Sequence, residues 1–523
     1  MTTLLAIIAE KPMYRRDRLL TVRCALWVSL SLSFVAANAK EVGASAQCAP
    51  EPKDCLALAL TAMGGRERLE AVKSLNVETV QHVLVVEQSY RQEPFLTSYA
   101  RTKQKIDFAG QRLLIQEHLI WPESDPGQSE SDSTSVVGPA GAVYRSKGPD
   151  QPASLVAVQD ARYLFGLGPM RVLLTAAQTS ELRYAAPEWV RSTLHPVLTF
   201  DWHGQPIKVL INPYNHLPDA VESVSMFADH WHQWGDVRQR VYFDNWQTFH
   251  GLVYPTNEVV ERNGVPWQSR QVIAFDANPP INEADFKMDA DTAQKALGSK
   301  GWESPFKGKD SVQLAAGITL YPGSWNVTIV RQDDGLVLLE APISGTFFGG
   351  VVDKAEEQNP GLRIKAVLST SDSWPHVGGV RQAVALGLPV YILDLNKPLL
   401  DRLMASPRHL QPDLLAQSPR RPVWRTVSEK IEVGSGANRM VLYPLRGAST
   451  ERQYMVYFPE HQLLYASDTL VLATDGSLPS AELTREVVEA VKREHLAVTM
   501  VFAMHQKPVP WSQVTALVAE AMK

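Results

Sequence analysis

The last two-fifths of the chain alternates short apolar runs with longer amphipathic segments, and this alternation limits the folds open to it. Unbroken apolar runs are typical of strands that are buried on both faces. We expect strands at residues 318–321, 326–332, 336–340, 364–369, 389–393, 440–444, 454–458, 462–467 and 498–504, and helices at 351–358, 377–386, 399–404, 481–495 and 511–522. Strands that alternate with helices in this way predict an α/β domain.

A different pattern occupies residues 77–286, where short alternating runs are separated by Asn-Pro and Asn-Gly turns. Alternation with period two indicates antiparallel strands with one buried face. Residues 54–75 predict two short helices around Gly64-Gly65, residues 160–178 predict one helix, and the Ser- and Asp-rich residues 121–141 predict a long exposed loop. We therefore predict an α+β protein with a mainly antiparallel β-rich domain at residues 40–304 and an α/β domain at residues 305–523.

Residues 1–39 have the layout of a secretory signal peptide. Four arginines at residues 15–23 precede an apolar run at 24–37, and Ala37-Asn38-Ala39 offers small residues for cleavage. The run of about 14 residues is shorter than the roughly 20 that span a bilayer as a helix. We expect a periplasmic or secreted protein without a membrane span after cleavage, and either Met1 or Met13 is the true start.

The charge of the chain excludes some classes of partner. The whole chain has a net charge of −5, and loss of residues 1–39 removes five basic and two acidic residues, which leaves −8. A negative surface disfavours DNA, RNA and anionic lipid. We therefore expect a small-molecule substrate or ligand and no nucleic acid.

Two cysteines remain after that cleavage, Cys48 and Cys55. Exported proteins meet an oxidising environment, and no third thiol competes for either residue. The spacing predicts a short-loop disulfide; the alternative is a pair of free thiols.

Several short sequence motifs follow one another along the predicted second domain. They are Leu-Val-Leu-Leu-Glu at 336–340, Ala-Val-Leu-Ser-Thr at 366–370 before His376-Val377-Gly378-Gly379, Leu-Leu-Tyr-Ala-Ser-Asp at 463–468, and a late strand that ends at His505. In this order and spacing the region resembles the metallo-β-lactamase superfamily. The resemblance implies an αββα sandwich with metal ions at one edge, held by an HxHxDH motif, a third His, a bridging Asp and a last His.

The sequence departs from that pattern at four of the seven ligand positions. With His376 on the last His of HxHxDH, Ser371 and Ser373 occupy the first two His positions and Pro375 occupies the Asp position. The third His position falls near Ser449. The resemblance therefore implies loss of the all-histidine metal site. The other site keeps His376, Asp468 and His505, with Asp372 as a candidate fourth ligand.

Two imidazoles and a carboxylate with open positions suit a divalent ion, Zn²⁺ above all, whereas serine hydroxyls do not. The resemblance thus implies at most one metal ion, catalytic roles for His376 and Asp468, and a substrate cleft lined by Ser371, Ser373, Ser449, Trp374 and Asp372. Metal-activated water would hydrolyse an ester, amide or phosphoester. The open alternative is a metal-free binding protein, or pseudoenzyme, that holds a ligand in the inherited cleft.

The first domain offers no catalytic constellation in its sequence. His230 and His232 flank Trp231, but no carboxylate or Cys stands at a ligand spacing, so an exposed strand face is expected there. The alternating strand pattern of the domain weakly resembles that of the curved antiparallel sheets in lipoprotein-carrier-like proteins. We expect it to bind or position a ligand through a concave apolar face.

Overall fold

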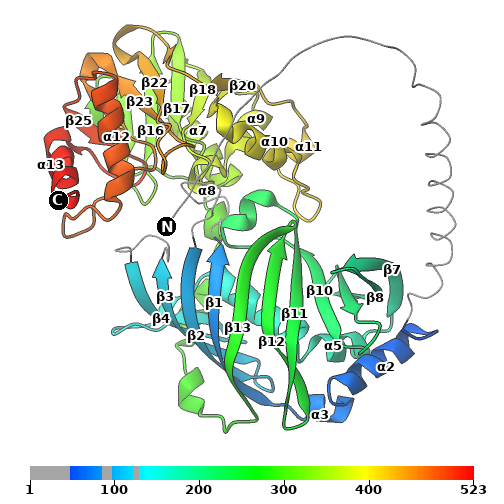
Figure 1. Cartoon of the computed structure of the whole chain (residues 1–523). Coiled ribbons are helices and arrows are strands. Elements are labelled where there is room, and N and C mark those ends of the chain that lie inside the picture. The colour runs from blue at the N-terminus through cyan, green and yellow to red at the C-terminus, as the bar shows by residue number, and fades with distance from the viewer. Residues whose placement is uncertain (1–47, 85–96, 122–128) are drawn as a thin grey trace, which may run out of the picture.

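The computed structural model of the chain describes residues 48–84, 97–121 and 129–523 (Figure 1). The proposed signal peptide at residues 1–39 lies outside them. A disulfide joins Cys48 and Cys55, which confirms the prediction from the cysteine spacing. Among the described residues no helix is both long and apolar enough to cross a bilayer.

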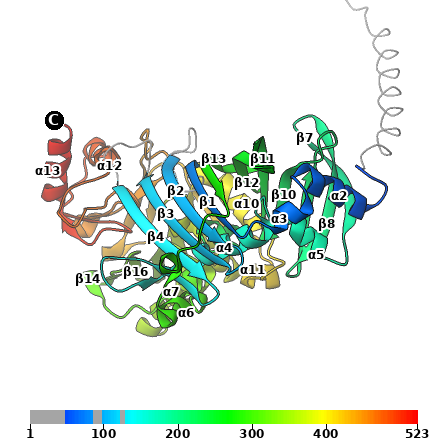
Figure 2. The ribbon, with the colours of Figure 1, turned by 90° about the horizontal axis from the view of Figure 1, so that it is seen from below.

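An antiparallel sheet of 13 strands makes up most of the first half of the chain (Figures 1 and 2). Its order is β6-β5-β4-β3-β2-β1-β13-β12-β11-β10-β9-β8-β7. The strands are β1 (Ser74–Leu84), β2 (Thr97–Asp107), β3 (Arg112–Trp121), β4 (Ser129–Gly138), β5 (Gly141–Tyr144), β6 (Gln151–Pro152), β7 (Arg183–Val190), β8 (Thr193–Trp202), β9 (Gln205–Ile211), β10 (Pro218–Ser225), β11 (Val237–Phe249), β12 (Leu252–Arg262) and β13 (Val265–Ala277). The edges are β6, with two residues, and β7, which contains Pro187.

Four helices pack on one face of this sheet and share a single apolar core with it. They are α2 (Pro52–Ala62), α3 (Arg66–Glu70), α4 (Leu155–Leu167) and α5 (Val172–Gln178). The single helix predicted at residues 160–178 is therefore two helices. The chain breaks at Gly168-Pro169, since proline disfavours helical backbone in the residue before it.

The exposed loop predicted at residues 121–141 is wrong for the part that the structure describes. Strand β4 fills residues 129–138 and pairs with β3 from Trp121↔Ser129 to Leu113↔Val137. Its polar residues Ser129–Ser133 contain too few apolar side chains to indicate a strand. Pairing along the whole length of β3 and burial of Val136 and Val137 hold the strand in place.

The second half of the chain forms four layers, as the αββα prediction requires. One sheet has seven strands in the order β14 to β20, and the other has six in the order β21 to β26. Helices α7 (Gly345–Gln358), α9 (Val380–Ala385) and α10 (Lys397–Ala405) cover the first sheet; α12 (Ala481–Arg493) and α13 (Trp511–Ala521) cover the second (Figure 1). The strands are β14 (Val312–Ala315), β15 (Ile318–Tyr321), β16 (Val327–Gln332), β17 (Gly335–Leu339), β18 (Ile364–Ser369), β19 (Val390–Leu393), β20 (Trp424–Val427), β21 (Ile431–Val433), β22 (Met440–Pro444), β23 (Tyr454–Phe458), β24 (Leu463–Tyr465), β25 (Met500–Phe502) and β26 (Val509–Pro510).

Strand β17 is apolar at every position because both of its faces are buried. Leu336 and Leu338 pack under the helices, whereas Val337 and Leu339 face the second sheet. Strands β17 and β18 are parallel, and so are β24 and β25. The carboxyl ends of parallel strands lie at one edge of a sheet. Loops from both sheets therefore leave the sandwich at a common edge.

The division of the chain at residue 304 stays a prediction. The 13-stranded sheet ends at Ala277, and the first strand of the sandwich begins at Val312. The connecting segment contains α6 (Ala290–Leu297), whose Ala293 packs in a small cluster with Phe286 and whose Ala296 belongs to the main core of the large sheet.

Candidate metal centre

Three side chains converge where the strands of the sandwich end. His376 lies in the one-turn helix α8 (Trp374–Val377) after β18, Asp468 follows β24, and His505 follows β25. One ligand atom from each lies within 4.8 Å of the other two. The His376 Nε2–Asp468 Oδ2 distance is 3.6 Å and the His505 Nε2–Asp468 Oδ1 distance is 3.1 Å.

A fourth residue, Glu340, contacts the Nδ1 side of the His376 ring. It directly follows β17 and is fully buried. Its Oε2 lies 3.1 Å from His376 Nδ1 and accepts the Thr370 amide at 3.1 Å, while Oε1 accepts the hydroxyls of Tyr465 (2.9 Å) and Thr370. Burial raises the pKa of Tyr465 well above its usual value, so the hydroxyl stays protonated and donates. Sequence reasoning missed this role, although a lone carboxylate at the end of a fully apolar strand was its signal.

The charges in this cluster compensate one another. Burial by itself would lower the pKa of His376, but the carboxylates of Glu340 and Asp468 raise it to about 10. Burial opposes ionisation of Asp468, yet His376 and His505 hold its pKa below the usual value. The pKa of His505 is raised, because Asp468 outweighs the effect of burial. The negative charges of two carboxylates and the positive charges of two imidazoles thus balance one another within the cluster.

The ring of His505 is oriented by the backbone. Its Nδ1 lies 2.8 Å from the carbonyl oxygen of Ser324, which accepts the Nδ1 proton. This contact leaves Nε2 directed at Asp468. A histidine held by its second nitrogen in this way has the orientation that metal ligands show in proteins.

Strained backbone surrounds the cluster. Glu340, Ile343 and Ser467 adopt left-handed conformations with φ of 71°, 67° and 55°. For a β-branched residue such as Ile343 this is a true outlier, and strain of this kind concentrates at functional sites. Gly378 is needed beside it, because a Cβ there would lie 2.1 Å from the Ile343 carbonyl oxygen.

The polar residues predicted to line the site are buried, and their lining role stays a prediction. Ser371 and Ser373 are 2% and 5% exposed, and the Ser371 hydroxyl accepts the Ser373 amide at 3.2 Å. The backbone of Ser449 donates to Glu486. Asp372, the candidate fourth ligand, lies outside the cluster of ligand atoms and has Arg452 at 3.8 Å.

Aromatic side chains stand next to these ligands. The ring centroids of Trp302, Trp325 and Trp374 lie 4.7 to 6.0 Å apart. Trp374 precedes His376 by two residues, and Trp325 follows Ser324, the partner of His505. These neighbours place the aromatic cluster beside the two histidines.

The prediction of an exposed strand at His230–His232 is wrong. The segment is the 3₁₀ turn η2 (His230–Trp234), and Trp231 and His232 are buried. His232 Nε2 lies 2.6 Å from the carbonyl oxygen of Ile343, so the turn between β10 and β11 contacts the loop that packs against Pro375 and His376. Asp229 caps the turn through the Trp231 amide. Trp231 packs in an apolar core of the second half of the chain, so this turn joins the two halves.

The first domain also contains a cavity of its own, of about 560 Å³. Apolar side chains of α4, among them Val158 and Phe165, line it together with Trp202 at the end of β8. Gly166 lies so close to Trp202 that a Cβ there would be 2.2 Å from the ring.

The donor set fits one divalent ion. Ligand atoms about 2.1 Å from a tetrahedral ion lie about 3.4 Å apart, and one ligand atom from each of the three residues lies within 4.8 Å of the other two, so small side-chain movements would bring them onto one ion. Neither ring nitrogen of His376 has a hydrogen bond of normal geometry to any described residue, although both are buried. Glu340 lies 3.1 Å from Nδ1, and a cation would give Nε2 the partner that it lacks.

No family model and no curated protein matches this sequence. Among solved structures, the chain is similar to the metallo-β-lactamases of Pontibacter korlensis and Hirschia baltica, at 15% and 16% identity and TM-scores of 0.32 and 0.31. The matches cover 40% and 41% of this chain and 98% and 97% of theirs. A stereoselective inverting sec-alkylsulfatase from Pseudomonas sp. is similar over 40% of each chain, at 15% identity and a TM-score of 0.30.

Proposed function

We propose that the protein is an exported hydrolase with one metal site formed by His376, Asp468 and His505. The observation that carries the proposal is the convergence of their ligand atoms within 4.8 Å. Zinc suits this N₂O donor set. When bound, the ion would supply Lewis-acid polarisation of an ester, amide or phosphoester and activation of a water nucleophile.

The residues of the chain have separate tasks in this proposal. Glu340 and the Ser324 carbonyl hold the two imidazoles by their Nδ1 atoms, so that both Nε2 atoms remain for the ion. Asp468 supplies the carboxylate ligand and lies near both Nε2 atoms. Ser371, Ser373 and Ser449 orient water or substrate, and Trp374 favours a substrate with an apolar part.

Metal analysis of protein purified without chelator tests the proposal. We expect one equivalent of zinc, lost in Asp468→Asn and in His505→Ala. The matched control is His461→Ala, because His461 lies in the same sandwich and contacts Asn438 at 2.8 Å instead of the cluster. The absence of metal from the parent protein after incubation with excess Zn²⁺ would refute the proposal.

A metal-free binding protein is the second candidate. It is favoured by the ion pairs that His376 and His505 make with Asp468, since the cluster is electrostatically complete without an ion. The two candidates differ in the effect of a chelator. EDTA lowers the unfolding temperature of a zinc protein and leaves that of a metal-free protein unchanged.

A further inference from the structure

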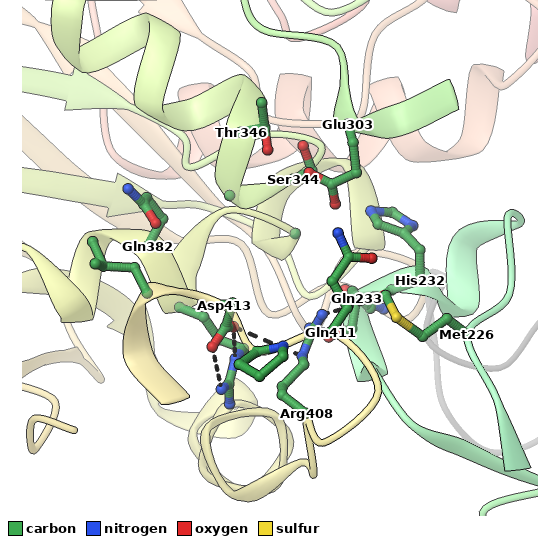
Figure 3. A pocket seen from close by; sticks show the side chains of 15 residues that line it. Met226, His232, Gln233, Glu303, Ser344, Thr346, Gln382, Arg408, Gln411 and Asp413 are labelled. Carbon is green, nitrogen blue, oxygen red and sulfur yellow. Dashed lines mark hydrogen bonds and ion pairs between the residues drawn. The ribbon is translucent and has the colours of Figure 1, made fainter. Parts of the chain in front are cut away.

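A cavity of about 190 Å³ lies where the two halves of the chain meet (Figure 3). Its wall includes His232 and Gln233 of η2, Ser344 before α7, and Arg408, Asp413 and Gln382. Gly378 also belongs to this wall, two residues after His376. The cavity is separate from the cluster of metal ligands.

Gln233 is the unusual member of this wall. The residue is 2% exposed, and neither its Nε2 nor its Oε1 has a hydrogen-bond partner among the described residues. A buried polar group left without a partner destabilises the fold. An occupant that offers an acceptor next to a donor would remove both penalties.

Arg408 is a cation that is partly engaged within this wall. Its Nη atoms donate to the carbonyl oxygens of His232 and Gln233, whereas its buried Nε makes no hydrogen bond to a described residue and lies 3.7 Å from Asp413 Oδ2 in an ion pair. Burial lowers the pKa of Arg408 to about 10, so the group is still a cation at neutral pH. Arg381 is not available to a ligand, since its nitrogens bond Asp413 and two backbone carbonyls.

The size and the charge of the cavity limit the occupant. Arg381 and Arg408 are balanced in formal charge by Glu303 and Asp413, which favours a neutral molecule. The volume equals that of roughly six water molecules at about 30 Å³ each. This space admits a small organic molecule.

We propose that this cavity binds a small neutral molecule that carries a primary carboxamide. The ligand carbonyl accepts a hydrogen bond from Gln233 Nε2, and the ligand N–H donates to Gln233 Oε1. Two amides paired in this way satisfy each other's donors and acceptors. The proposal does not depend on a metal at His376.

Ligand-observed NMR titration of the mature chain tests the proposal with two probes of almost equal size. N-acetylglycinamide is neutral and ends in a primary carboxamide, whereas N-acetylglycine ends in a carboxylate. We expect saturable binding of the amide and binding of the acid that is weaker by about tenfold or more. This comparison needs no variant.

Two variants then locate the site. Gln233→Leu removes the unpaired amide, and we expect it to weaken amide binding by about tenfold or more. Gln294→Leu is the matched control, because Gln294 is exposed on α6 and does not line this cavity, and the affinity of this variant should stay within twofold of the parent, about 0.4 kcal/mol. The proposal is overturned if the acid binds as tightly as the amide, if Gln233→Leu binds unchanged, or if tens of millimolar amide give no saturable signal because water alone fills the cavity.

Discussion

Glu340→Gln is the substitution that best tests the architecture of the candidate site. The change keeps the shape of the side chain and replaces one carboxylate oxygen by an NH₂ group. Each oxygen of Glu340 faces two potential donors: Oε1 faces the hydroxyls of Thr370 and Tyr465, and Oε2 faces the Thr370 amide and His376 Nδ1. Whichever way the amide turns, its NH₂ points at two of these groups.

The expected cost follows from this count. Two contacts to a charged acceptor are lost, at about 1.5–3 kcal/mol each, so unfolding should become easier by about 3–6 kcal/mol. With a denaturant slope of about 3 kcal/mol/M, the urea midpoint of the second domain should fall by about 1–2 M.

Tryptophan fluorescence during urea unfolding measures the shift, with Glu489→Gln as the control. Glu489 makes only an exposed ion pair with Arg485 on α12, so its replacement should cost less than about 0.5 kcal/mol. If the Glu340→Gln midpoint lies within about 0.3 M of the parent, corresponding to about 1 kcal/mol at the same slope, the reasoning about this carboxylate is wrong.

Three further predictions concern other parts of the chain. Asp229→Asn breaks a 2.5 Å ion pair with the buried Arg262 and should cost about 3–5 kcal/mol by calorimetry at pH 7. Burial opposes the ionisation of Asp229, but Arg262, the neighbouring His230 ring and the Trp231 amide together hold the pKa of Asp229 below its usual value. Its stabilisation should therefore be complete above about pH 4 and disappear as the pH falls through the lowered pKa; a loss that does not depend on pH would contradict this. Gly378→Ala places a Cβ against the Ile343 carbonyl and should cost about 1–3 kcal/mol or more in urea unfolding, whereas Gly148→Ala, whose Cβ would meet nothing closer than 3.8 Å, should be neutral. Reduction of the Cys48–Cys55 disulfide should lower the unfolding free energy by about 2–3 kcal/mol, and two free thiols in the denatured, unreduced protein would contradict the bond.

The apolar strands of the second domain could be predicted because burial on both faces leaves a local signature. The expected strands at residues 318–321, 364–369, 440–444 and 454–458 have the same bounds in the structure. Short strands such as β20 and β21 were missed, since three or four residues of mixed polarity have no such signature. The strand at residues 129–138 was missed because its neighbour β3 supplies the pairing.

The candidate site could be predicted only in part. The resemblance pointed to His376, Asp468 and His505, which the structure brings together, and their roles remain a proposal. The contact between Glu340 and His376 joins residues 36 positions apart in the sequence, and the contact between His232 and Ile343 joins residues 111 positions apart. Contacts of this kind depend on the folded sandwich and on its position against the large sheet, and no local pattern encodes them.

The 13-stranded sheet is open, so it presents unpaired backbone amides and carbonyls at two borders. A strand from another molecule could add at either border and begin aggregation. At one end β6 has only two residues, one of them Pro152, and at the other Pro187 interrupts β7, where the register shifts between Ala185 and Glu188. Proline lacks the amide hydrogen that an incoming strand needs. Replacement of Pro187 by Val should therefore leave the fold intact and make the protein more prone to self-association at high concentration.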